Sequence, residues 1–170
     1  MNKKELYFLR HAIAVESGTF GSSEKTRPLT EEGSQRMIQS VKGFKRLKIN
    51  PEVILSSPFT RAWQTAELVK THLPFLAEIE TEENLQPGGE LEEFLKKIRK
   101  RKEERFLLVG HEPSLSFWIQ DLLEFRGRAR VQMKKGALCH LKLEWTDSYL
   151  KAELVSLLQP RVLRRIGSSD

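Results

Sequence analysis

The amino-acid sequence predicts an α/β fold, in which strands and helices alternate along the chain. Short apolar segments at 6–9, 53–55 and 106–109 are each followed by a segment whose apolar residues recur at helical spacing. From 137 to 145 the side chains instead alternate with a period of two, which is typical of a half-buried strand. The length of 170 residues suits one domain, and we predict a single domain over 1–170.

The first apolar segment, 6–9, predicts a buried strand. A helix is predicted to begin after Thr30, which has the side chain of an N-cap, and to end near Leu47. The intervening segment, 12–28, contains glycines and serines and predicts a loop. A loop of this length in a small domain is usually functional, which makes it a candidate cover for an active site.

A second strand–helix unit begins with the apolar segment 53–55. We predict that Ser57 caps the following helix and that Pro58 occupies its first position, a common arrangement at helix starts. The apolar stripe of this helix consists of Ala62, Ala66, Val69 and Leu73. A short strand is predicted around Ile79.

The second half of the chain predicts two further helices and an antiparallel hairpin. Apolar residues mark helices at 91–98 and 115–122, on either side of the strand at 106–109. The strand at 137–145 leads through a Thr-Asp-Ser turn into a strand at 149–157, which favours a hairpin.

Charge and composition limit the classes of ligand. The net charge of +6 and the pI near 9.5 favour acidic ligands: phosphorylated molecules, nucleic acid or an anionic membrane surface. The densest basic segment, 96–102, is interpreted as the solvated face of a helix, and no aromatic–basic motif supports nucleic-acid binding. No apolar segment approaches the roughly 20 residues that a membrane helix needs. We therefore predict neither a nucleic-acid nor a membrane partner.

Cysteine and histidine usage gives further expectations. A single cysteine, Cys139, fits a reducing compartment, and with no signal-peptide pattern we predict a cytoplasmic location. Cys139 is interpreted as an inert core thiol, and His72 and His140 as structural or solvated. No Cys/His cluster has zinc spacing and no glycine-rich nucleotide loop occurs, so we predict no metal and no cofactor.

Cationic or titratable side chains follow three of the predicted strands. Arg10 and His11 follow the first, Arg61 lies shortly after the second, and His111 follows the strand at 106–109. In open α/β sheets ligands bind at the carboxyl ends of the strands, so we expect these side chains to converge. Two arginines and two histidines, with no acidic partner in those turns, suit a dianion such as a phosphoryl group.

Three segments together resemble the signatures of the histidine phosphatase superfamily, the phosphoglycerate-mutase-like enzymes. They read Phe-Leu-Arg-His-Ala at 8–12, Ser-Ser-Pro-Phe-Thr-Arg-Ala-Trp-Gln-Thr-Ala at 56–66 and Val-Gly-His-Glu-Pro at 109–113. The short length and Arg-Pro-Leu-Thr at 27–30 are similar to the SixA-type phosphohistidine phosphatases, a small branch of that superfamily. The resemblance covers nearly the whole chain.

The resemblance implies a three-layer α/β/α sandwich around a mainly parallel sheet with an antiparallel edge. It also implies a metal-independent, ping-pong phosphotransfer in which His11 attacks the phosphoryl group and water then hydrolyses phospho-His11. Arg10, Arg61 and His111 are the implied catalytic partners. The candidate residues for substrate binding are Arg10, Arg27, Ser57, Arg61 and His111.

The sequence departs from the family pattern at two positions. Ala12 stands where most members have glycine, which is tolerable if the backbone φ there is negative. Asn84 stands where larger relatives have a glutamate that acts as general acid, and an amide cannot donate that proton. Glu83 and Glu24 are the candidate replacements. A missing acid favours phosphohistidine as substrate, because an imidazole leaving group needs less protonation than an alkoxide.

The function predicted from the sequence is a phosphohistidine phosphatase that acts on phosphoproteins, such as a histidine-phosphotransfer domain. One alternative is a broad phosphomonoesterase of the same superfamily, acting on small phosphorylated substrates. Another is a non-catalytic domain that binds phosphate or phosphoproteins, although the four intact residues of the predicted pocket argue against it.

Overall fold

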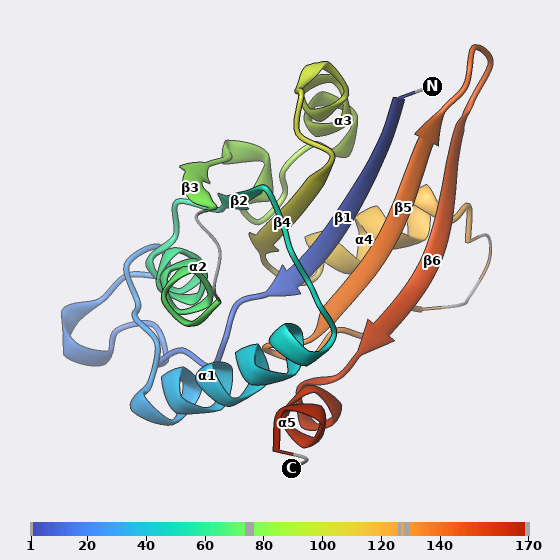
Figure 1. The fold of residues 1–170 in the computed structure, drawn as a ribbon. Helices are drawn as coiled ribbons and strands as arrows, with labels where there is room; N and C mark the ends of the chain where they lie inside the picture. Colours follow the sequence, from blue (N-terminus) through green and yellow to red (C-terminus); the bar gives the residue numbers. More distant parts are fainter. Residues whose placement is uncertain (1, 74–76, 126, 128–129, 169–170) are drawn as a thin grey trace.

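The computed structural model describes residues 2–73, 77–125, 127 and 130–168, and a six-stranded sheet runs through it (Figure 1). The strands are β1 (Asn2–Arg10), β2 (Val53–Ser56), β3 (Glu78–Thr81), β4 (Arg105–Gly110), β5 (Leu138–Trp145) and β6 (Leu150–Leu158). They lie in the order β3-β2-β4-β1-β5-β6, and the first four are parallel. Because β5 and β6 run antiparallel to their neighbours, the sheet is mainly parallel with an antiparallel edge, as predicted.

Helices cover both faces of this sheet (Figure 1). They are α1 (Glu31–Arg46), α2 (Thr60–His72), α3 (Leu91–Lys100), α4 (Ser114–Leu122) and α5 (Pro160–Ser168), with short 3-10 helices η1 (Thr19–Gly21) and η2 (Glu83–Leu85). Successive residues of a strand point to opposite faces, so Leu6 and Phe8 pack with α3 and α4, whereas Tyr7 and Leu9 pack with α1, α2 and α5. This is the three-layer α/β/α sandwich that was expected. The single domain over 1–170 stays a prediction.

The register of the sheet brings the carboxyl ends of three strands to one edge. Arg10 at the end of β1 pairs with Gly110 at the end of β4, and Ser56 at the end of β2 pairs with Val109. His11 and Ser57, which directly follow β1 and β2, extend this pairing, since the backbone N–H of each donates to a β4 carbonyl oxygen at a distance of 3.0 Å. The cationic turns that follow these strands therefore meet at the same edge.

The predicted start of α2 is wrong. The helix begins at Thr60, with Phe59 as an N-cap whose side chain makes no capping bond. Ser57 and Pro58 lie before the helix, and Oγ of Ser57 accepts the N–H of Phe59 at 3.2 Å and lies 2.8 Å from Nε2 of His111. The Ser57 hydroxyl hydrogen-bonds the buried His111 ring instead of capping α2, because a buried ring nitrogen needs a hydrogen-bond partner.

The helix α5 is absent from the sequence prediction. Its one fully buried apolar side chain among the described residues, Leu163, packs in the same cluster as α1. Gly43 of α1 allows this contact, since a Cβ there would lie 2.3 Å from the carbonyl oxygen of Leu163. The apolar residues Val162, Leu163 and Ile166 of α5 have helical spacing, but the segment directly follows the predicted hairpin strand and was not predicted as a helix. No helix in the described part of the chain is long and apolar enough to cross a membrane.

Candidate active site

His11 lies directly after β1 and is buried, with 3% of its surface exposed. Its Nδ1 is 2.7 Å from the carbonyl oxygen of Ala12, and Nε of Arg61 donates to its Nε2 at 3.1 Å. Because a guanidinium N–H can only donate, Nε2 must be unprotonated and Nδ1 carries the proton. Burial, together with nearby arginines and a second histidine, lowers the pKa of His11 to about 2. The ring is therefore neutral at physiological pH and keeps an electron pair on Nε2.

The second histidine of the site is His111, which follows β4. Its ring centre lies 5.1 Å from that of His11. Its Nε2 contacts the Ser57 hydroxyl, and its Nδ1 is buried with no hydrogen-bond partner in the described part of the chain. Burial, together with the charges of three nearby arginines, lowers the pKa of His111 to about 3. The predicted convergence of two histidines is thus present, and both rings are neutral.

Arg61, in the first turn of α2, links His11 to the loop 12–28. The side chain is buried, with 2% of the residue exposed. While its Nε donates to His11, its Nη1 donates to the carbonyl oxygen of Glu24 at 2.6 Å and its Nη2 to the Glu24 carboxylate at 2.8 Å. Burial lowers the pKa of Arg61 to about 10, so the guanidinium stays charged at neutral pH. Arg61 therefore presents donors to the imidazole and to an anion beside it.

Glu24, a candidate acid from the loop 12–28, is that anion, and it reaches the site from outside the turns in which no acidic partner was expected. Its Oε1 also accepts a hydrogen bond from Nη2 of Arg27 at 2.9 Å, and its other oxygen lies 2.9 Å from Nε of Arg27. The hydrogen bond from Arg27, with the charge of Arg61, lowers the pKa of Glu24 although the side chain is half exposed. Two arginines thus hold one carboxylate where the sequence predicts a phosphoryl group.

Arg10 reaches the same edge of the sheet. Its Nη1 donates to the carbonyl oxygen of Met133 at 2.8 Å, and its Nε is buried with no partner among the residues described. Burial lowers the pKa of Arg10, opposed by the nearby charge of Glu112, and repulsion from Arg27 lowers it further. The structure therefore places all five predicted binding residues, Ser57 included, at the carboxyl ends of the parallel strands.

The two candidate acids differ in position and charge. Glu83 is exposed and accepts a hydrogen bond from Gln86, and the structure does not bring it to the cationic cluster. Glu24 does reach the cluster, but its lowered pKa keeps it ionised, which makes it a poor proton donor. Asn84 donates its side-chain N–H to the carboxylate of Glu82 at 2.7 Å, so the residue in the family's acid position is engaged locally.

Two residues of the site were missed as functional candidates. Glu112 follows His111; one carboxylate oxygen accepts from Ser116 at 2.5 Å, and the other is buried with no partner in the described chain. Burial raises the pKa of Glu112, so it is the more easily protonated carboxyl near Arg10. A glutamate inside a turn gives no sequence signal of burial, and only its position beside the predicted His111 could have indicated it.

The other missed residue is Thr65, which fixes the backbone after His11. Its Oγ1 accepts the N–H of Ala12 at 3.0 Å and donates to the carbonyl oxygen of Arg61 at 2.7 Å. One hydroxyl thus ties the end of β1 to the first turns of α2. Ala12 does not have a positive φ, so alanine fits there without strain in place of the family's glycine.

Cys139 and His140 lie away from the candidate active site and have structural contacts. Cys139 is fully buried, and burial raises the pKa of its thiol to about 12, which keeps it unreactive. His140 stacks on Tyr7 and contacts the Glu5 carboxylate at 3.0 Å. No three His, Cys, Asp or Glu side chains in the described ranges are grouped as in a metal site, and the absence of a metal or cofactor stays a prediction.

Comparisons with known proteins assign this chain to a family. A sequence profile described as the histidine phosphatase superfamily (branch 1) matches residues 6–92, a range that includes His11, Arg27 and Arg61. The chain belongs to this superfamily. An uncharacterized protein from Picosynechococcus is 30% identical over 145 residues, which cover 81% of this chain and 84% of that protein.

Two further similarities concern SixA. Phosphohistidine phosphatase SixA of Escherichia coli is 26% identical over 121 residues, covering 69% of this chain and 73% of that protein. The solved structure of the protein histidine phosphatase SixA complexed with tungstate superimposes with a TM-score of 0.77 at 22% identity, covering 92% of this chain and 97% of that one. The superfamily resemblance inferred from the motifs is confirmed, and the shared fold agrees with the predicted sandwich.

The lowered pKa values predict how stability depends on pH. The two histidines have pKa values of about 2 and about 3 in the folded protein, against 6.5 as the ordinary value. Below 6.5 the unfolded chain therefore binds protons that the folded chain does not. The free energy of unfolding is expected to fall as pH falls through this range, by up to about 1.4 kcal/mol per pH unit for each histidine.

Urea unfolding at several pH values between about 7 and about 5 would measure this slope. A His111→Asn variant is expected to show a shallower slope than the wild type. His72→Ala is the matched control, because His72 is exposed at the end of α2. Equal slopes in the His111→Asn variant and the wild type would show that His111 is not held neutral by the fold.

Proposed function

We propose that this protein is a phosphohistidine phosphatase that acts on phosphoproteins, with His11 as its nucleophile. The observation that carries this proposal is the fixed tautomer of His11, whose Nδ1–H is bonded to the Ala12 carbonyl while Nε2 keeps its electron pair. A nucleophilic imidazole must present one unprotonated nitrogen and have the other held by an acceptor. Membership of the histidine phosphatase superfamily supports the same assignment.

Two displacements make up the proposed reaction. In the first, Nε2 of His11 attacks phosphorus, a new N–P bond forms, and the bond to the substrate imidazole breaks, with the departing nitrogen taking a proton from solvent. In the second, water attacks phospho-His11, the N–P bond breaks, inorganic phosphate leaves with the water oxygen, and one proton of that water returns to solvent. His11 is then restored as the neutral ring seen in the structure.

The cations would stabilise the phosphoryl group as its charge spreads over the equatorial oxygens. Arg61 and Arg27 both donate to Oε1 of the Glu24 carboxylate, and Nε of Arg27 lies beside its other oxygen, in the manner in which guanidinium groups bind phosphate. Arg10 and His111 complete the cluster from the adjacent strands. Before a phosphoryl group could bind, Glu24 would have to release its hydrogen bonds to Arg27 and Arg61. The loop 12–28, which carries Glu24, would then act as the cover of the site that the sequence predicts.

The acid–base character of the site favours a phosphohistidine over an alkyl phosphate ester. Glu24, the acidic residue in contact with the catalytic cations, is held ionised by Arg27 and Arg61. An alkoxide leaving group needs a proton from a strong general acid, whereas an imidazole leaves with less assistance. Glu112 is easier to protonate, but among the described hydrogen bonds its carboxylate contacts Ser116 and not the cationic cluster. A missing general acid costs roughly 10²- to 10⁴-fold in rate, which would fall mainly on esters.

A substrate panel tests this proposal. We expect kcat/KM for a chemically phosphorylated phosphohistidine protein to exceed that for glycerol phosphate by at least about 100-fold. Equal or better turnover of the ester would contradict the proposal and favour the small-molecule phosphomonoesterase. If the protein bound inorganic phosphate but turned over neither substrate, the non-catalytic binding domain would replace it.

A further inference from the structure

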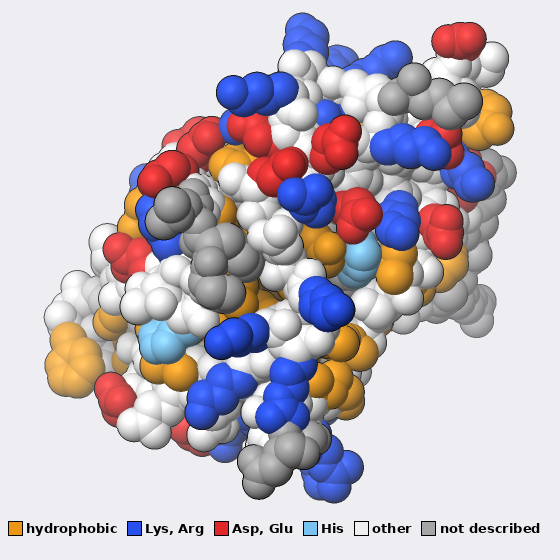
Figure 2. Space-filling view, in the orientation of Figure 1, with side chains coloured by type: hydrophobic (Ala, Val, Ile, Leu, Met, Phe, Trp, Pro, Cys, Tyr) orange, Lys and Arg blue, Asp and Glu red, His pale blue; other side chains and the backbone are white. Residues whose placement is uncertain are grey.

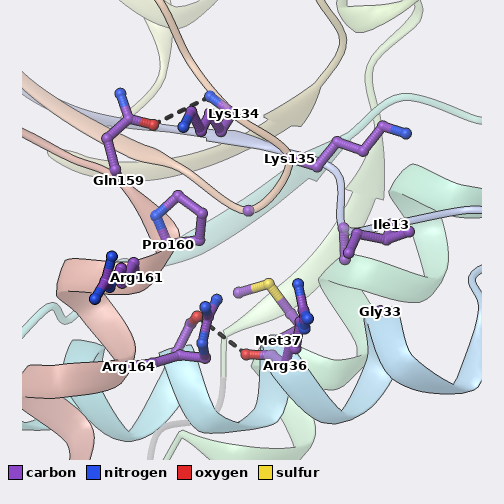
Figure 3. Close-up of a pocket in the computed structure, with 13 residues that line it drawn as sticks. Ile13, Gly33, Arg36, Met37, Lys134, Lys135, Gln159, Pro160, Arg161 and Arg164 are labelled. Atoms are coloured by element: carbon purple, nitrogen blue, oxygen red, sulfur yellow. Dashed lines mark hydrogen bonds between the residues drawn. The ribbon is translucent and has the colours of Figure 1, made fainter.

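A basic groove adjoins the candidate active site without being part of it. We define it by five cationic residues: Arg36, Lys134, Lys135, Arg161 and Arg164. Figure 3 shows them around a cavity between α1, α5 and the segment that precedes β5. The cavity has a volume of about 250 Å³, and no aspartate or glutamate is among the described residues that line it.

The groove continues directly from the catalytic residues. Ala12, which follows the nucleophile, is part of its lining. The N–H of Gly136, which also lines the groove, donates to the carbonyl oxygens of Arg10 at 3.1 Å and His11 at 3.2 Å. Lys135 lies near enough to Arg10, Arg27 and Arg61 for their repulsion, added to partial burial, to lower its pKa. A chain bound in the groove would therefore reach the phosphoryl site.

The positive charge of the groove is largely uncompensated within the described chain. Arg36 pairs with Glu32, but no ion pair joins Lys134, Lys135, Arg161 or Arg164 to a carboxylate in the described residues. Burial and repulsion from Arg36 and Arg161 lower the pKa of Arg164. Like charges held together without partners disfavour the free state electrostatically, and an anionic ligand would relieve that repulsion.

The shape of this region favours an extended ligand over a single small ion. A second cavity of about 390 Å³ shares Arg161 and Arg164 and continues along the groove between α1 and α5 to Ser168. Figure 2 shows Lys and Arg side chains gathered over these two helices. The amino terminus of α5 also lines the first cavity through Pro160, and the positive end of a helix dipole favours negative charge.

We propose that the basic groove docks an acidic segment of the phosphorylated protein substrate, next to the phosphohistidine that enters the site of His11. This inference rests on the proposed function for its substrate but on separate residues for its binding. Two arginines of α5 and two lysines before β5 would pair with carboxylates of the segment. Docking would contribute to KM and to salt-dependent association, and would leave the chemical step unchanged.

The direct test uses a fluorescein-labelled hexaglutamate peptide and requires no catalysis. The double variant Arg161→Gln/Arg164→Gln is expected to weaken peptide binding roughly tenfold, and added salt should weaken binding to the wild type more than to the variant. Lys142→Gln/Lys151→Gln is the matched control, with the same loss of charge from exposed positions on β5 and β6. Unchanged thermal unfolding would show that α5 remains packed.

The kinetic test separates docking from the proposed function. With an acidic phosphohistidine protein, the arginine double variant is expected to raise KM about tenfold at unchanged kcat, while turnover of the small compound phosphoramidate stays the same. The docking proposal is overturned if the peptide binds both double variants equally, or if an oligonucleotide of equal charge binds more tightly than the peptide. If peptide binding behaves as expected but no phosphohistidine is hydrolysed, the proposed function fails and the acidic-segment site stands.

Discussion

Replacing His11 with alanine is expected to lower kcat for a phosphohistidine protein by at least about 10⁴-fold, as removal of a covalent nucleophile does in other enzymes. The electron pair of Nε2, held by the tautomer that the Ala12 carbonyl fixes, would be lost. Arg61 would keep its contacts with Glu24 and continue to bind anions. We therefore expect affinity for inorganic phosphate to change far less than kcat. Steady-state kinetics and phosphate titration would measure both quantities.

His72→Ala is the control for this substitution. His72 is exposed, and its Nδ1 contacts only the carbonyl oxygen of Leu68 among its hydrogen bonds in the described structure. Its removal should leave kcat within about twofold of the wild type, as for an ordinary surface position. A His11→Ala variant that kept a tenth of the wild-type kcat, with unchanged thermal unfolding, would contradict the role of His11.

Replacing Arg61 with alanine is expected to reduce kcat by about 10²- to 10³-fold, by analogy with the loss of one transition-state donor. The side chain is buried and donates both to Nε2 of His11 and to the anion beside it. Without it, the phosphoryl oxygens would lose charge-assisted hydrogen bonds, and Glu24 would lose one of its two arginine partners. Measurements of kcat and KM at fixed salt would show the effect mainly in kcat.

Arg61→Lys tests whether charge alone explains this effect. A lysine keeps the charge, but it lacks the planar guanidinium that donates to His11, to the Glu24 carbonyl and to the Glu24 carboxylate at once. We therefore expect only partial recovery of kcat. Arg105→Ala is the matched control, because Arg105 pairs with Glu52 at the start of β4, at the opposite end of that strand from His111. Full activity in Arg61→Lys would show that a point charge suffices and that the guanidinium geometry is unnecessary.

The strand ends could be predicted because their signals are local. The buried apolar segments of β1, β2 and β4 are short and hydrophobic on both faces, and an arginine or histidine follows each of them within about five residues. Parallel pairing then brings those residues to one edge whatever the details of packing. His11, Arg61 and His111 therefore meet as expected, although they lie far apart in the sequence.

The contacts that depend on tertiary packing could not be predicted in the same way. Glu24 was a candidate acid of the site, but the loop 12–28 has no periodicity, so the sequence did not indicate that its carboxylate would bind Arg61. Ser57 has the side chain of a helix cap, but a buried histidine competes for its hydroxyl. The basic groove combines α1, α5 and the segment before β5, and α5 is the helix that the sequence did not reveal.

Rapid quench of the protein with a radiolabelled phosphohistidine protein tests the central claim most directly, because it detects the covalent intermediate itself. The mechanism predicts a protein-bound label that is lost in acid and stable in base, that forms before phosphate is released, and that is absent from His11→Ala. Release of labelled phosphate with no labelled protein at any time, or a label that persists in His11→Ala, would contradict attack by His11.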